Sequence, residues 1–329
     1  MTRRNALVAG IALVLARSVP AQPRVASIGY LGPSAETAPQ LLEAFRQGLA
    51  SLGYEEGRNL RIEYRWTNAG TRMNDADVLA ASARELVAKP VAVLVASIDP
   101  AIVAARKATS TLPIVMLNAS DPVGLGFVAS LPHPGGNVTG LTNQSQELIG
   151  KKLQILLEAV PGVKRIGMLV SGPGSLRNDT IARAGELATS RGITLKVAEA
   201  TSAAALDGAF AELSRGGAEA LLVADTGGGV FFTERGRLAE LALAHRLPSM
   251  FGNAEIVDSG GLMSYAPRSP ENYRRAGFFI DKILKGTKPG EIPVEQPTTF
   301  ELTLNMKTAK ALNLTVPPAL LLRVDRVVR

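Results

Sequence analysis

From Pro23 onward, short apolar, β-branched runs alternate with longer segments whose apolar residues recur at helical spacing. This alternation predicts parallel α/β architecture, because a helix must return the chain between parallel strands. Gly, Pro, Ser or Asp stands at each junction, as is typical of strand-to-helix turns. In the first half we expect strands at Val25–Leu31, Leu60–Tyr64, Val91–Ala96 and Pro113–Leu117, and helices at Pro39–Leu52, Asp75–Val87 and Ala101–Ala108.

The second half repeats this scheme. Arg24–Ser34 resembles Lys164–Ser175 in its strand and in the Gly-Pro turn that follows. A repeat this long indicates two similar doubly wound lobes whose strand carboxyl ends meet at a shared crevice. Here we expect strands at Lys164–Val170, Thr194–Ala198, Ala220–Ala224 and after Pro248, and helices at Leu176–Thr189, Ala204–Leu213 and Thr233–Ala244.

Three Gly/Pro-rich stretches predict crossings between the lobes: Pro132–Gly136 with Gly140–Thr142, then Ser259–Gly261, then Lys288–Pro297. Three crossings form a hinge of few residues, which suits clamshell closure. We therefore assign residues 24–141 plus about 262–290 to the first lobe. The second lobe takes residues 142–261 plus about 291–329.

The first 21 residues have the pattern of a cleavable signal peptide. Arg3 and Arg4 precede an eleven-residue apolar run, Ala6–Ala16, and Val19-Pro20-Ala21 offers a cleavage site. Eleven residues make about 16 Å of helix, which is too short for a hydrocarbon core of about 30 Å. The pattern predicts export to the periplasm; Sec and twin-arginine export both remain open.

Composition excludes several classes of protein. Of 329 residues, 46% are hydrophobic and 20% charged, which suits folded lobes rather than disorder. Removing residues 1–21 leaves 33 basic and 29 acidic residues, a net charge of +4, with no basic stripe. No nucleic-acid partner is therefore predicted. The chain has no cysteine, so disulfides, thiolate nucleophiles and a lipoprotein cysteine are excluded.

Enzyme chemistry finds little support. The two histidines, His133 and His245, fit neither metal-ligand spacing nor a catalytic triad. Gly172-Pro173-Gly174 follows a strand, but Arg177 occupies the third glycine position of a dinucleotide motif. We predict no enzyme activity, no metal and no cofactor.

Carboxylates at strand ends, Asp99, Asp121 and Asp225 with Glu255 slightly later, keep an alternative open, an α/β enzyme that uses them in acid–base chemistry. Asp99 and Asp121 each precede a proline, however, an arrangement common at turns and helix entries. Structural capping explains these two residues equally well.

Several segments resemble the solute-binding proteins of tryptophan- and tyrosine-type ABC uptake systems. They are Ala44–Tyr54, Glu56–Trp66, Asp121–Gly124, Pro134–Thr142, Gly260–Tyr265, Asp281–Gly286, Pro293–Pro297 and Asn305–Leu312. The resemblance covers essentially residues 24–329 and implies the type I periplasmic-binding fold. It implies capture of a small polar, amino-acid-like solute between the lobes of a monomer and delivery to an ABC permease with its ATPase.

The resemblance also implies which residues line the cleft. From the first lobe we expect Ser34, Ser97, Asp99, Ala101, Ser120, Asp121 and Asn143. From the second we expect Ser171, Ser175, Arg177, Asn178, Asp225, Thr226, Asn253, Glu255 and Tyr265. Relatives often carry Thr-Pro-Ala where this chain has Asp99-Pro100-Ala101. An acid there repels a carboxylate and favours a solute with an amine or several hydroxyls.

Aromatic candidates are few, namely Tyr265, Phe231 and Phe232, which disfavours a tryptophan-like solute. Phe231 and Phe232 fit core positions at the start of a helix equally well.

Two further functions share this fold. A regulator's effector domain would need a DNA-binding segment where the signal peptide stands, whereas a receptor subunit for a sensor kinase is not separable from a transport protein by sequence.

Overall fold

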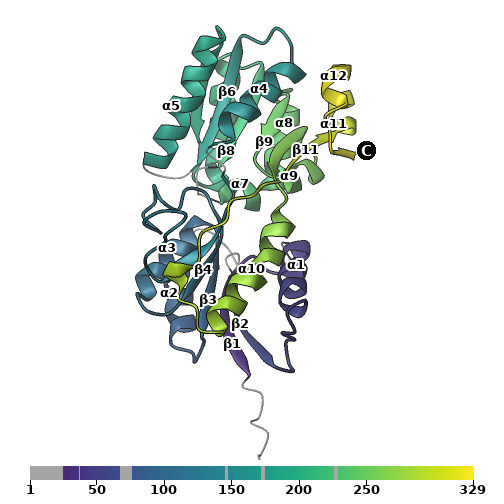
Figure 1. Ribbon diagram of the computed structural model, residues 1–329. Helices are drawn as coiled ribbons and strands as arrows, with labels where there is room; N and C mark the ends of the chain where they lie inside the picture. Colours follow the sequence, from purple (N-terminus) through teal and green to yellow (C-terminus); the bar gives the residue numbers. More distant parts are fainter. Residues whose placement is uncertain (1–24, 37, 67–75, 145–146, 172–174, 226–228) are drawn as a thin grey trace, which may run out of the picture.

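The computed structural model describes residues 25–329, apart from residue 37 and the segments 67–75, 145–146, 172–174 and 226–228. The expected signal peptide therefore lies outside the described residues. Within the described part, no helix combines the length and apolar character needed to cross a membrane. The described chain forms two α/β lobes, one above the other in Figure 1.

The first lobe is built on a five-stranded sheet in the order β2-β1-β3-β4-β5, and every pairing in it is parallel. Its strands are β1 (Ala26–Gly32), β2 (Leu60–Trp66), β3 (Val93–Ser97), β4 (Ile114–Ala119) and β5 (Val138–Thr142). Its helices are α1 (Pro39–Ala50), α2 (Ala76–Val87), α3 (Asp99–Ala108) and α10 (Ser269–Leu284), with the short η2 (Pro289–Glu291) close to β5.

The second lobe is built on a seven-stranded sheet in the order β12-β11-β10-β9-β8-β6-β7, parallel except where β11 runs antiparallel to β10. Its strands are β6 (Arg165–Ser171), β7 (Thr194–Glu199), β8 (Ala220–Asp225), β9 (Ser249–Phe251), β10 (Met263–Pro267), β11 (Phe300–Asn305) and β12 (Arg326–Val328). Its helices are α4 (Ile149–Ala159), α5 (Ser175–Ser190), η1 (Ala203–Ala205), α6 (Leu206–Arg215), α7 (Val230–Thr233), α8 (Arg235–Ala244), α9 (Ala254–Asp258), α11 (Met306–Ala311) and α12 (Pro318–Leu321).

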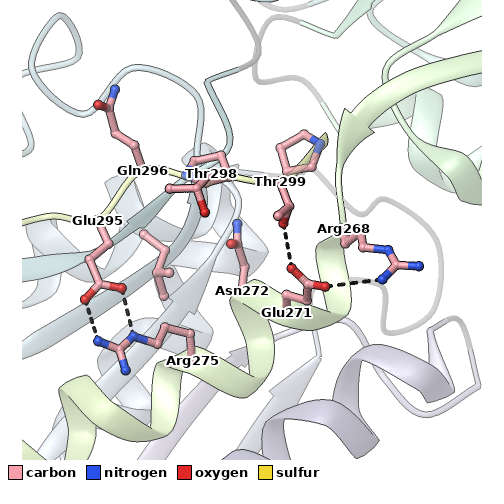
Figure 2. Close-up of a pocket in the computed structure, with 11 residues that line it drawn as sticks. Arg268, Glu271, Asn272, Arg275, Glu295, Gln296, Thr298 and Thr299 are labelled. Carbon is pink, nitrogen blue, oxygen red and sulfur yellow. Dashed lines mark hydrogen bonds and ion pairs between the residues drawn. The ribbon is translucent and has the colours of Figure 1, made fainter. Parts of the chain in front are cut away.

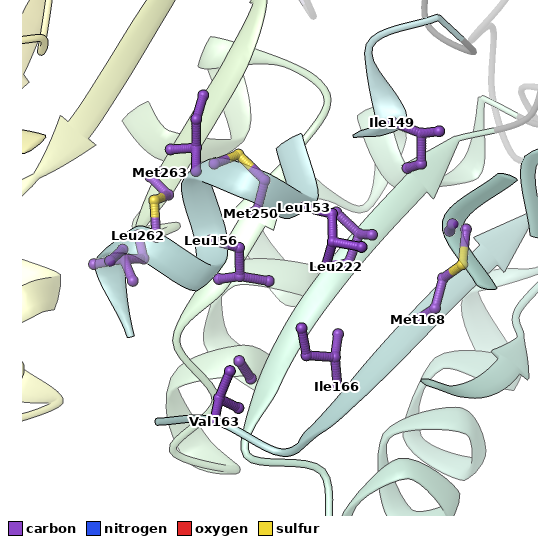
Figure 3. Close-up of a cluster of buried hydrophobic side chains, with 14 of the residues drawn as sticks. Ile149, Leu153, Leu156, Val163, Ile166, Met168, Leu222, Met250, Leu262 and Met263 are labelled. Atoms are coloured by element: carbon purple, nitrogen blue, oxygen red, sulfur yellow. The ribbon is translucent and has the colours of Figure 1, made fainter. Parts of the chain in front are cut away.

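The central strands of each sheet are buried on both faces, as is typical of parallel sheets with helices on both sides. Successive side chains of a strand point to opposite faces. Accordingly, Ile28 and Tyr30 of β1 join a cluster with α1 and α10, whereas Leu31 joins a cluster with α2 and α3. In the second lobe, α4 and α5 cover one face, where Leu153 and Leu156 pack on Ile166 and Leu222 (Figure 3).

Helices α1 and α10 approach closely because glycines face each other where they cross. A β-carbon on Gly48 would collide with the carbonyl oxygen of Arg274, and one on Gly277 would lie 2.6 Å from the carbonyl oxygen of Gly48. Gly in a helix interior costs about 0.5–1 kcal/mol relative to Ala. Here it permits backbone contact, and this contact fastens α10 to the first lobe.

The chain crosses between the lobes three times. The first crossing follows Thr142, the second follows Pro267, and the third runs through residues 295–299 to β11. The first and third crossings lie side by side, because the backbone N–H of Thr142 donates to the carbonyl of Glu295 (3.0 Å). The second crossing corrects the expected boundary near residue 262: β10 pairs with β9 and β11, so it belongs to the second sheet.

The carboxyl ends of the first sheet point toward the second lobe, since all its strands are parallel and β5 leads directly into that lobe. In the second lobe, α7 and α9 follow β8 and β9 and lie at the end that faces the first lobe (Figure 1). We call these two facing ends the inter-lobe face. Ligands of doubly wound folds bind at such strand carboxyl ends.

Candidate functional site

The loops after β3 and β4 are joined at the inter-lobe face by Asp99. Its carboxylate accepts hydrogen bonds from the backbone N–H of Ser120 (3.0 Å) and from the Ser120 hydroxyl. Both residues are buried, with 7% exposure each. Asp99 is the first residue of α3 and precedes Pro100, so it stands at a helix entry as expected, while the N-cap position is Ile98 and has no side-chain cap hydrogen bond. The first function of Asp99 is to tie two loops of the first lobe together.

The first turn of α10 provides a second tie. The hydroxyls of Tyr273 and Ser97 share a hydrogen bond, and Nδ2 of Asn272 donates to Oδ1 of Asn118 (2.8 Å) and to the carbonyl of Thr142 (3.2 Å). These contacts hold the ends of β3, β4 and β5 in register. Burial raises the pKa of Tyr273 well above its usual range, so its hydroxyl stays protonated at neutral pH.

Three residues other than glycine have positive φ angles, in the left-handed region, at these strand ends. They are Ile98 (φ 68°), Asn118 (φ 54°) and Gln144 (φ 51°). Ile98 is the most unusual, because a β-branched side chain disfavours positive φ. Such strain costs of order 1–3 kcal/mol per residue and tends to cluster at functional sites. The strained residues therefore gather at the first lobe's part of the inter-lobe face, as expected for a functional site.

The remaining first-lobe candidates differ in their surroundings. Ser34 (8% exposed) and Ala101 (fully buried) lie at the starts of the segments after β1 and β3. Nδ2 of Asn143 donates to the carbonyl of Asn118 (3.2 Å), which places Asn143 with the group above. Asp121 accepts a hydrogen bond from the N–H of Gly124 (2.8 Å) and therefore closes a turn.

Second-lobe candidates gather at the ends of β6 and β8. Ser171 is buried and stands in register with Asp225 across these strands. The side chains of Asp225 and Ser175 and the whole of Thr226 fall outside the described residues. Asn178 is exposed on α5 and Arg177 forms an ion pair with Glu199 (2.6 Å), and their role in binding stays a prediction.

Glu255 belongs to the second lobe's part of the inter-lobe face. It stands in α9, two residues after Asn253, and is partly exposed. Burial raises the pKa of its carboxyl, the carboxylate of Asp258 adds to this, and Arg326 and Arg235 oppose it. The Glu255 carboxylate in turn adds to the raised pKa of Tyr273 in the first lobe. The last candidate, Tyr265, is partly exposed on β10 and stacks on Phe300 with ring centroids 5.8 Å apart.

Sequence reasoning missed a buried cation in the second lobe. Lys152 of α4 is only 3% exposed, and a β-carbon on Gly252 would lie 3.5 Å from its Nζ. Gly252 follows β9 directly, so the Lys152 ammonium lies beside the second lobe's facing end. Lysine is rarely buried unless it is paired, and Lys152 does have an interaction within the protein. The apolar residues of α4 recur at helical spacing and predict a helix that faces the core. A single lysine among them therefore does not stand out in the sequence.

Aromatic side chains were also underestimated. Trp66 is the last residue of β2 and stacks on Tyr64, with ring centroids 4.8 Å apart. Phe231 is core in the second lobe (1% exposed), whereas Phe232 is partly exposed and packs against the first lobe's cluster. The expected strand ended at Tyr64; extending its alternation by two residues finds Trp66.

A pocket of about 260 Å³ lies at the hinge (Figure 2). On one side, Arg275 donates two hydrogen bonds to Glu295 (2.8 and 2.7 Å). On the other, Glu271 accepts from Thr299 (2.9 Å) and pairs with Arg268 (3.5 Å). Its lining comes from α10 and the crossings: Leu141, Pro267, Arg268, Glu271, Asn272, Arg275, Glu295, Gln296, Pro297, Thr298 and Thr299.

These features define a two-lobed binding protein with polar side chains on both facing ends and a charged hinge. Across the described residues, no group of three or more His, Cys, Asp or Glu side chains could hold a metal ion. The family model of ABC transporter substrate-binding proteins matches residues 34–328. The chain belongs to this family, and the expected type I periplasmic-binding fold is confirmed.

Known proteins similar to this chain agree with that assignment. A tyrosine-binding protein of Clostridioides difficile is 25% identical over 272 residues, which cover 83% of this chain and 76% of the relative. A conserved domain protein of Vibrio cholerae has a solved structure with a TM-score of 0.83, 25% identity and coverage of 92% and 100% of the two chains. An ABC domain of Streptococcus pneumoniae, solved in complex with L-Trp, gives a TM-score of 0.77, 24% identity and the same coverages.

Proposed function

We propose that this protein is the extracytoplasmic receptor subunit of an ABC uptake transporter and captures an α-amino acid between its lobes. Support comes from one observation above the others: polar and charged side chains stand on both facing ends of two lobes joined by three crossings. A solute that contacts both ends favours closure, and closure removes it from water. The similarity to a tyrosine-binding protein supports an amino acid as the solute.

The residues at the inter-lobe face suit a zwitterion. Carboxylates at Asp99, Asp225 and Glu255 would hold an ammonium group, while hydroxyls at the ends of the strands, such as that of Ser34 (8% exposed), would hold a carboxylate. Each charge-assisted hydrogen bond contributes about 1.5–3 kcal/mol. Micromolar binding requires about −8 kcal/mol, which several such bonds provide after closure costs.

The remaining parts of the proposal follow from the family. The protein is a monomer of the periplasm, binds no cofactor, hands its solute to a membrane permease powered by a separate ATPase, and performs no chemistry on it. A receptor subunit for a sensor kinase would use the same binding site but a different membrane partner.

A thermal-shift screen of the mature chain from Gln22 tests the proposal, with L-amino acids, sugars, polyols and purines as probes. A ligand at 100 times its dissociation constant stabilises the native state by about 2.7 kcal/mol, which raises the midpoint by several degrees. We expect shifts with amino acids and no product. Shifts with sugars or purines alone, or turnover of any probe, would overturn the proposal.

Asp225→Ala is the matched variant for this screen, with Asp207→Ala as control. Asp225 ends β8 at the inter-lobe face, whereas Asp207 lies in α6 and pairs with Arg237. We expect Asp225→Ala to abolish the amino-acid shift while the variant still folds cooperatively. Asp207→Ala is expected to retain it.

A further inference from the structure

Basic residues gather at the end of the second lobe that lies opposite the inter-lobe face, uppermost in Figure 1. Because β6, β7, β8 and β9 are parallel, their first residues lie together at this end, with the last residues of α5, α6 and α8. We call this end the basic pole, and its basic residues are Lys164, Arg165, Arg191, Lys196, Arg215 and Arg246.

Side chains that are far apart in the sequence are neighbours at the basic pole. A β-carbon on Gly216, the residue after Arg215, would lie 3.6 Å from Cγ of Lys196. A β-carbon on Gly217 would lie 3.0 Å from Nε of Arg165. Three turns of the chain therefore bring cations to one surface, although the sequence shows no run of basic residues.

A hydrogen bond extends this surface to a fourth turn. The hydroxyl of Ser214 and Nδ1 of His245 lie 2.7 Å apart, and this bond joins the last turn of α6 to the segment after α8. Arg246 follows His245 directly and is exposed. The basic pole is thus a continuous surface built from the turns between successive helices and strands.

The cations of the basic pole have few acidic partners. All six are exposed, and only Arg165 forms an ion pair, with Glu219, among the residues that the structure describes. Glu212 is exposed on α6 but does not pair with Arg215. The corresponding end of the first lobe differs, since four of its cations pair with acids: Arg58 with Glu55, Arg61 and Lys89 with Glu63, and Lys285 with Asp281. The second lobe therefore carries a concentrated positive potential at its end.

We infer that the basic pole binds the anionic phospholipid headgroups of a membrane surface. Exposed cations on separate turns, without acidic neighbours, suit an extended anionic surface that contacts all of them at once. Each Lys or Arg close to such a surface adds to the attraction. The inference goes beyond solute capture, because the inter-lobe face lies at the other end of the lobe and stays open to solutes.

A structural role for these cations makes a different prediction. Positive charges near the carboxyl end of a helix interact favourably with the helix dipole, and Arg215 is the last residue of α6. If this were their whole role, removing them would lower the thermal midpoint and leave lipid binding unaffected. Vesicle binding and thermal midpoint are therefore measured on the same variants.

The test measures binding of the mature chain from Gln22 to vesicles by cosedimentation. Vesicles of phosphatidylglycerol and phosphatidylcholine are compared with vesicles of phosphatidylcholine alone. Salt is raised from about 0.1 M to about 1 M, which shortens the Debye length from about 10 Å to about 3 Å. A resin that carries poly-L-glutamate tests an acidic polypeptide as the alternative ligand.

The double variant Lys196→Gln, Arg215→Gln removes two charges from the basic pole. Its matched control is Lys107→Gln, Lys288→Gln, which changes the net charge equally. Lys107 lies in the last turn of α3 and Lys288 just before η2, and both are exposed and form no ion pair with the residues that the structure describes. The control therefore separates a local surface from overall charge.

We expect the unmodified chain to bind the phosphatidylglycerol vesicles at low salt, to leave them at high salt, and to ignore phosphatidylcholine alone. The basic-pole variant should bind on the order of tenfold more weakly and the control less than about threefold more weakly. Equal weakening in the two variants, no binding to phosphatidylglycerol vesicles, or binding to poly-L-glutamate without binding to vesicles would overturn the inference. Each of these outcomes leaves amino-acid capture intact, because the thermal-shift screen contains no lipid.

Discussion

Arg275 and Glu295 join helix α10 to the third crossing through two hydrogen bonds, of 2.8 and 2.7 Å. The Glu295 carboxylate raises the pKa of Arg275, and the pair forms one wall of the hinge pocket in Figure 2. Since Glu295 also bonds the first crossing through its backbone, this ion pair touches two of the three connections between lobes. Its position suits control of lobe movement better than support of either core.

Arg275→Met is therefore expected to alter solute affinity with little effect on stability. Both side chains are partly exposed, at 44% and 36%, and pairs of this kind contribute about 0.2–1 kcal/mol. We expect the dissociation constant for the bound amino acid to change by up to about fivefold. Arg165→Met is the control, because the Arg165–Glu219 pair has similar exposure but lies in the second lobe's sheet. An equal change in both variants would contradict a specific hinge role.

Tyr273→Phe should destabilise the first lobe. The change leaves the Ser97 hydroxyl buried without its partner, and an unsatisfied buried group costs about 1–3 kcal/mol. Urea unfolding measures the loss. Tyr54→Phe is the matched control, because the Tyr54 hydroxyl bonds Asp281 (3.0 Å) at a partly exposed site where water can replace it. Equal losses in the two variants would show that burial of Ser97 does not matter.

Glu255 should make stability depend on pH. Its pKa is raised in the folded state, so its neutral form is favoured there, and its contribution is present at acid pH and lost as the pH rises through the raised pKa. The groups that face it are Asp258, Arg326, Arg235 and Tyr273. We expect Glu255→Gln to gain stability relative to the unmodified chain as the pH increases from 4 to 8. Parallel pH profiles of the two midpoints would contradict this.

Gly48→Ala tests the helix crossing that fastens α10 to the first lobe. The added β-carbon would collide with backbone, so we expect a loss of about 3 kcal/mol or more in the free energy of unfolding. Gly185→Ala in α5 is the control, because a β-carbon there meets nothing within 4 Å. That variant should gain about 0.5–1 kcal/mol from helix propensity. Similar effects in the two variants would refute the close contact.

Much of the fold was predictable because local pattern and local structure agree in most elements. The strand expected at Thr194–Ala198 forms at Thr194–Glu199, and the helix expected at Asp75–Val87 forms at Ala76–Val87. The helix expected at Thr233–Ala244 is interrupted at Glu234, so that α7 and α8 are separate. The tail was harder to predict, since β11 lies between β10, to which it is antiparallel, and β12, to which it is parallel, and only contacts distant in sequence decide such pairings.

From the sequence, the site was predictable mainly as the set of loops that follow the strands. Strand ends identify Ser97, Asp99 and Ser120, but not that Asp99 and Ser120 bond each other. Tyr273 and Asn272 stand in a helix more than 120 residues away in sequence, and only the three-dimensional crossing brings them to these loops. Lys152 lies within a helix whose pattern predicts core, so its place beside Gly252 required the structure.

Isothermal titration of the mature chain with L-tyrosine and L-phenylalanine tests amino-acid capture most directly. We predict saturable heat with one solute per chain and a dissociation constant on the order of micromolar, which corresponds to about −8 kcal/mol. Asp225→Ala should give no such heat. Absence of binding heat in the folded, unmodified chain at several temperatures, with either amino acid, would contradict capture of such an amino acid between the two lobes.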